Sequence, residues 1–84
     1  MASVTLQQAG RTSVPETDNI DGPWTTVPTY WVQVDGQTAG WTWRKFARGD
    51  VWRVRFPNGG GYGPVARSRR AAVGYIVGRH ERSK

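Results

Sequence analysis

The sequence predicts an α+β domain in which a small antiparallel sheet of three to four strands packs against one C-terminal α-helix. Strand-like segments rich in tryptophan, tyrosine and valine come first, and turn residues separate them. A serine then precedes a segment whose apolar residues recur at helical spacing. A run of strands followed by a helix is typical of the α+β class.

Residues 1–28 are predicted to form a flexible, mostly disordered N-terminal arm. They are rich in Thr, Ser, Gln, Asp, Gly and Pro, and their scattered apolar residues show no sustained period of 2 or 3.6. Trp24 is the exception, because a tryptophan is unusual in a disordered arm. We expect it to pin the arm onto a folded domain that spans residues 29–80.

The strands are expected at 30–34, 41–46 and 51–56, where β-branched and aromatic residues dominate. Asp35-Gly36 follows the first strand and readily adopts the positive φ angles of a two-residue hairpin turn. In the third strand, Trp52, Val54 and Phe56 alternate with two arginines, so the apolar residues face the core and the arginines face outward.

A short final strand is expected at 62–65, before the helix. Ser68 can cap the helix through its side-chain oxygen. The helix should run to about residue 79, followed by a frayed tail at 81–84. Gly74 inside it costs about 1 kcal/mol relative to alanine, which indicates a close approach of helix and sheet. Its core-facing side is predicted from helical spacing to be Ala71, Ala72, Tyr75 and Ile76.

Charge is distributed very unevenly along the 84 residues, whose net charge is +6. Residues 41–84 carry eleven Lys and Arg against two acidic residues, a net charge of +9, whereas residues 1–40 carry −3. So positive a surface favours a polyanion as partner. Arginine outnumbers lysine ten to two, which favours nucleic acid over lipid, although a GC-rich coding sequence would also raise the arginine content.

The composition argues against other classes of function. The chain has no cysteine, which excludes a disulfide framework and a thiolate metal site and fits a cytoplasmic location. Six scattered carboxylates and one histidine offer no pattern for catalysis, a metal site or a cofactor, so we expect no enzyme. No apolar run is long enough for a membrane span, and no signal-peptide pattern is present, so we expect no membrane association.

The candidate binding residues are basic side chains of the second half of the chain. Arg53 and Arg55 should share the outer face of their strand, and Arg44 on the neighbouring strand could join them. Basic residues in the first turn of a helix oppose its dipole, which indicates an anionic ligand there. The predicted nucleic-acid contacts are Arg44, Lys45, Arg48, Arg53, Arg55, Arg67, Arg69 and Arg70.

Tryptophans interleave with these arginines. Trp41 and Trp43 share one face of their strand, where they form either part of the core or a stacking surface. Trp31 faces opposite to its valine neighbours and should be partly exposed. Trp31 and Trp43 are therefore the candidates for base stacking or for contact with a protein partner.

Several short motifs resemble the three-stranded-sheet-plus-helix DNA-binding domains of plant ethylene-response factors and of phage integrase arm-binding domains. The motifs are the strand 51–56, the glycine-containing hairpin after it, Gly63-Pro64-Val65, Ser68, Ala71-Ala72 and Tyr75. The resemblance covers about residues 41–79. The chain departs from the family at Arg69 and Arg70, where acidic residues are common, and in the extra strand at 30–34.

This resemblance implies a sheet that lies in the major groove, with Arg44, Arg53 and Arg55 at the contact positions, in a regulator or a phage or mobile-element protein. The sequence thus predicts a protein that binds duplex DNA through its sheet and the basic start of its helix. Two alternatives remain open. One is a small interaction module or inhibitor that binds an acidic protein, and the other is a binder of RNA or single-stranded DNA.

Overall fold

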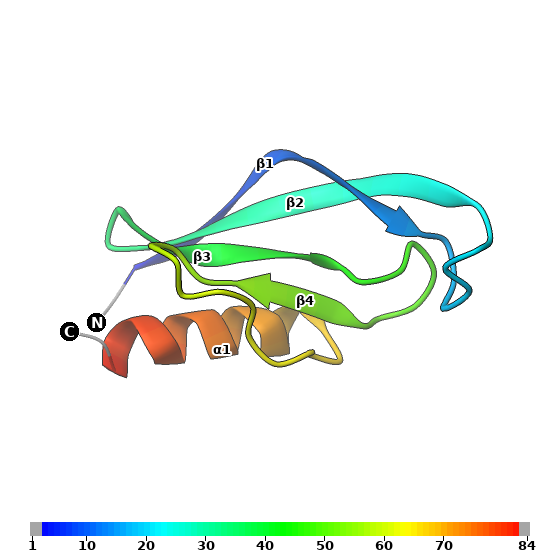
Figure 1. Cartoon of the computed structure of the whole chain (residues 1–84). Coiled ribbons are helices and arrows are strands. Elements are labelled where there is room, and N and C mark those ends of the chain that lie inside the picture. The colour runs from blue at the N-terminus through cyan, green and yellow to red at the C-terminus, as the bar shows by residue number, and fades with distance from the viewer. Residues whose placement is uncertain (1–2, 83–84) are drawn as a thin grey trace.

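The computed structural model describes residues 3–82 as one antiparallel four-stranded sheet and one helix (Figure 1). The strands pair in the order β1-β2-β3-β4, so each strand lies beside its neighbour in sequence. The predicted α+β class is therefore confirmed. The elements are β1 (Val4–Pro15), β2 (Trp24–Val34), β3 (Gln37–Arg44), β4 (Trp52–Arg55) and α1 (Arg69–Arg82).

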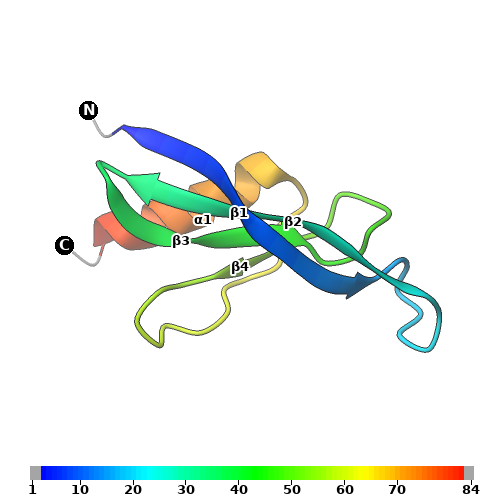
Figure 2. The same cartoon turned by 90° about the horizontal axis from the view of Figure 1, so that it is seen from above.

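The main core lies between α1 and one face of the sheet, and Figure 2 shows the helix behind the strands. Ala72 and Ile76 are fully buried and pack on Val32 and Val54. Burial of these apolar side chains is the main force that holds the helix on the sheet. The prediction that Ala71 and Tyr75 share this buried side is wrong. Both are exposed, and the half-buried Val73 and Val77 complete the packed side of α1.

The close approach of helix and sheet occurs at Gly40 in β3, and not at Gly74 as predicted. A Cβ at position 40 would lie 2.6 Å from the carbonyl oxygen of Arg55 and 3.0 Å from the Ile76 side chain. Gly74 has nothing within 4 Å of the same position and faces solvent. The sheet therefore supplies the small residue that lets α1 sit close.

The prediction of a disordered arm over residues 1–28 is wrong for most of that segment. Residues 4–15 form β1, and β2 begins already at Trp24. Backbone pairing with β2 holds β1, whose side chains from Val4 to Arg11 are all exposed. An edge strand exposed in this way carries no apolar alternation, which is why sequence periodicity missed it. Residues 1 and 2 lie outside the described residues.

The β1–β2 hairpin is bent and makes contacts beyond its own sheet neighbours. The pairing of β1 with β2 shifts register between Gln8 and Arg11, at Gly10, whose φ is 103°. Beyond this bulge, the backbone N–H of Ala47 donates to the carbonyl of Pro15 at 3.0 Å, as does that of Arg48 to Glu16. The end of the hairpin is thereby tied to the β3–β4 loop.

Other boundaries differ modestly from those predicted. Asp35 and Gly36 have positive φ, which confirms the two-residue turn. The segment 62–65 does not form a strand. Only Tyr62 and the following Ala66 make isolated bridges, to Arg55 and Trp52 of β4. The Ser68 hydroxyl accepts a hydrogen bond from the N–H of Ala71 at 3.0 Å, which confirms the cap. The helix continues to Arg82, so residues 81 and 82 are not frayed, while 83 and 84 lie outside the described residues.

Within residues 3–82, no helix is long and apolar enough to cross a membrane.

Two glycine substitutions should change stability in opposite directions. Gly40→Ala should lower the free energy of unfolding by about 1–3 kcal/mol, because the new methyl group meets backbone and Ile76. Gly74→Ala should raise it by about 0.5–1 kcal/mol, because the position is helical and open. Urea unfolding followed by circular dichroism measures both. Equal effects of the two substitutions would contradict the packing described here.

Candidate functional site

The face of the sheet opposite α1 gathers tryptophan and arginine side chains. The strand register pairs Trp31 with Trp41, Trp41 with Arg55, and Trp43 with Arg53. Residues that are directly paired across antiparallel strands point to the same face. These five side chains, here called the open-face cluster, are Trp31, Trp41, Trp43, Arg53 and Arg55.

The arginines of the open-face cluster lie against aromatic rings. The guanidinium carbon of Arg53 is 4.8 Å from the centre of the Tyr62 ring, and that of Arg55 is 5.9 Å from the centre of the Trp41 ring. Contacts of this kind are attractive and hold a long side chain in place while its charge stays in water. Arg55 is exposed and Arg53 is half-buried, so both guanidinium groups are held at the surface of the sheet.

The two tryptophans of β3 share this face, as predicted, but have different environments. Trp43 is buried in a second small core with Val14 and Val27, and Trp41 packs against it half-buried. Trp31 is also half-buried, and its indole N–H donates to the Thr38 hydroxyl at 3.0 Å. Trp43 therefore serves the fold first, whereas Trp31 and Trp41 offer part of their rings to solvent.

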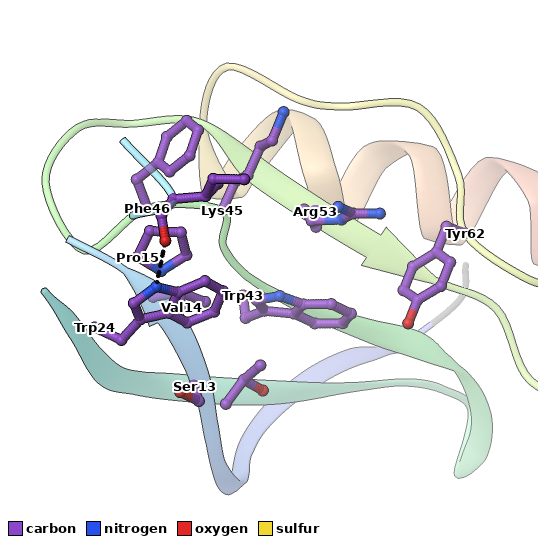
Figure 3. Close-up of a pocket in the computed structure, with 11 residues that line it drawn as sticks. Ser13, Val14, Pro15, Trp24, Trp43, Lys45, Phe46, Arg53 and Tyr62 are labelled. Atoms are coloured by element: carbon purple, nitrogen blue, oxygen red, sulfur yellow. Dashed lines mark hydrogen bonds between the residues drawn. The ribbon is translucent and has the colours of Figure 1, made fainter. Parts of the chain in front are cut away.

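A groove of about 410 Å³ opens where the β1–β2 hairpin faces the open-face cluster (Figure 3). We call it the hairpin groove. Figure 3 shows Trp24 and Tyr62 on opposite sides with Trp43 between them. Lys45 and Arg53 bring two positive charges to the lining. Trp24 and Tyr62 are 53% and 61% exposed, and both border the same groove.

Arg44 does not join Arg53 and Arg55, contrary to the prediction. It is paired with Trp52, which belongs to the main core, so its side chain lies on the helix side of the sheet. Its guanidinium donates to the Gly49 carbonyl at 2.7 Å, lies 3.8 Å from the Asp50 carboxylate and stacks 5.4 Å from the Trp52 ring. Arg44 therefore closes the β3–β4 loop.

The same side of the sheet holds a second basic pocket, of about 590 Å³, at the beginning of α1. Arg44, Arg67 and Arg69 line it together with Tyr30 and other residues, and the Arg69 guanidinium lies 5.2 Å from the Tyr30 ring. The first turn of α1 contains no acidic residue. These three arginines, here called the helix-side group, are on the opposite face of the sheet from Arg53 and Arg55.

The remaining predicted residues fall outside both groups. Lys45 lines the hairpin groove, with its ammonium nitrogen 5.3 Å from the Phe46 ring. Arg48 is exposed in the β3–β4 loop, and Arg70 is exposed on α1 beside Arg69. Of the eight basic residues predicted from the sequence, two thus belong to the open-face cluster, three to the helix-side group and three to neither.

Trp24 and Tyr62 are the residues whose part in the site the sequence did not reveal. Trp24 was expected only to pin an arm, and Tyr62 only to lie in a short strand. The nearest sequence signal is a large aromatic residue within a turn-rich segment, where few apolar neighbours are present to bury it. Among residues 3–82, no three His, Cys, Asp or Glu side chains gather where they could hold a metal ion.

Comparison of the chain with protein-family models, with curated proteins and with solved structures finds no match.

Two tryptophan substitutions should separate the structural ring from the exposed one. Trp43→Ala should lower the free energy of unfolding by about 3–5 kcal/mol, because it empties the second core. Trp24→Ala should lower it by no more than about 1 kcal/mol, because that side chain is largely exposed. Thermal and urea unfolding measure the difference. A large loss for Trp24→Ala would assign this ring to the core.

Proposed function

We propose that the protein binds duplex DNA through the open-face cluster. The observation that carries the proposal is that Arg53 and Arg55 of β4 lie on the same face of the sheet, opposite the face that α1 covers. The major groove admits a two-stranded ribbon as well as a helix, and arginine is suited to both guanine edges and phosphates. Tyr62 and Trp41 hold the two guanidinium groups in position.

The helix-side group is proposed to contact phosphates of the DNA backbone, outside the major groove that Arg53 and Arg55 enter. Arg67 and Arg69 flank Ser68, where the helix dipole adds positive potential to their own charges. Lys45, Arg48 and Arg70 strengthen the positive field that draws DNA to the domain. Such a protein would act as a regulator or as part of a phage or mobile element, as the sequence resemblance implies, and the absence of cysteine fits a cytoplasmic location.

A second candidate function is favoured by the exposed Trp24. Tryptophan, tyrosine and arginine dominate interface hot spots, and the same surface could bind an acidic protein. The two functions differ in which substitutions matter. Loss of the guanidinium groups of Arg53 and Arg55 should abolish DNA binding, whereas Trp24→Ala and Trp31→Ala should weaken a protein complex more.

The variant Arg53→Ala/Arg55→Ala should lose about 1–3 kcal/mol of DNA binding free energy per guanidinium. Its salt slope should fall by about 1 for each of the two side chains that contacts a phosphate. Binding to a short labelled duplex across a salt series, followed by fluorescence anisotropy, measures both quantities. The wild-type affinity should fall linearly with salt on a log–log plot.

The matched control is Arg79→Ala/Arg82→Ala, which removes the same charge from exposed positions of α1. It should change the affinity far less, because neither side chain belongs to the open-face cluster or to the helix-side group. An equal loss of affinity in both double variants would indicate a purely charge-dependent association. Absence of binding by the wild type at low salt would refute the proposed function.

A further inference from the structure

We propose that the hairpin groove receives one unpaired base of a DNA strand whose duplex part lies on the open-face cluster. This inference rests on the proposed function and makes it more specific. The ligand is then duplex DNA that carries a single-stranded segment, and not a continuous duplex.

The groove has the size and walls that a base requires. Its volume of about 410 Å³ falls within the range of about 300–1,000 Å³ that is usual for small-ligand sites. Trp24 and Tyr62 expose their rings from opposite sides, and Trp43 lies between them (Figure 3). Stacking on aromatic side chains is the general means by which proteins hold unpaired bases, because every base presents a π-face.

Polar groups of the groove suit the edge of a base and its phosphate. Thr12 of β1 lines the groove, and its hydroxyl, which already hydrogen-bonds with the Thr29 hydroxyl, can make a further hydrogen bond to a base edge. Lys45 and Arg53 contribute two positive charges, and the lining residues include no carboxylate. The positive charge of the groove therefore matches an anionic strand. A basic peptide would find no carboxylate in the lining to pair with.

The charges around the groove also give the strand a direction. The hairpin tip carries Glu16, Asp18 and Asp21, and the two aspartates flank Ile20, which lines the groove. These acidic residues repel phosphate, so the backbone should leave the groove on the side of Lys45 and Arg53. Arg53 belongs to both the groove and the open-face cluster. One strand can therefore pass from the groove to the open-face cluster without a break in positive charge.

The test compares a labelled blunt duplex with the same duplex that carries a short single-stranded thymine overhang, at one fixed salt concentration. The wild-type protein should bind the overhang DNA at least about fivefold more tightly, the lower end of what stacking of one base contributes. Trp24→Ala should remove this preference and leave the affinity for the blunt duplex unchanged. Trp24→Phe should retain most of it, because a stacking ring remains.

The control variant is Tyr75→Ala, which removes an aromatic ring of comparable exposure from the outer side of α1. It should keep the preference intact. A second readout is tryptophan fluorescence. The overhang DNA should quench the wild type more than it quenches Trp24→Phe, since Trp24 is the exposed indole of the groove, whereas the Trp43 indole that remains in the variant is buried.

The outcomes separate this inference from the proposed function. Equal affinity of the wild type for blunt and overhang DNA overturns the base-binding groove while the duplex contact stands. A preference that survives Trp24→Ala also overturns it. So does an oligoglutamate peptide that binds the groove when the overhang DNA does not. Absence of binding to either DNA refutes the proposed function itself.

Discussion

The packing of α1 against a single face of the sheet is the constraint on which the rest of the structure depends. Ile76 and Ala72 are fully buried there, and Gly40 lets the helix come close to the strands. Because the chain has one helix among its described residues, only one face can be covered in this way. The period of two in β3 and β4 then sends alternate residues to opposite faces. Covering one face therefore determines which arginines and tryptophans are presented to a partner on the other.

The open face is not left bare, and what shields it also shapes the hairpin groove. The bulge at Gly10 bends the hairpin, and hydrogen bonds from Ala47 and Arg48 tie its end to the β3–β4 loop. This contact encloses Trp43 with Val14 and Val27 in a second core. A small domain has little apolar surface to bury, so a second cluster adds stability that one helix cannot supply. The same bend places Trp24 on the opposite side of the hairpin groove from Tyr62, with Trp43 between them.

The distribution of arginines links these features to the proposed function. Arg53 and Arg55 stack on aromatic rings at the open face. The three arginines of the helix-side group lie around the start of α1. A surface designed for solubility alone would mix both signs of charge and would place acidic residues in the first turn of the helix. Of the six acidic residues, Asp50 pairs with Arg44, but Glu16, Asp18 and Asp21 lie in the β1–β2 loop, so that residues 1–40 carry −3 and residues 41–84 carry +9. Such a separation of charge would orient the domain toward a polyanion before contact.

The sequence by itself determined the fold class, the two-residue turn at Asp35-Gly36, the cap at Ser68 and the opposite facing of Trp52 and Arg53, because each depends on local geometry or on periodicity within one strand. Only the tertiary structure decided the rest. Backbone hydrogen bonds to β2 hold β1 in the sheet, and no pattern of side chains in the sequence predicts this pairing. The face on which Arg44 lies depends on register across strands, and the hairpin groove depends on a bend that brings together residues distant in sequence.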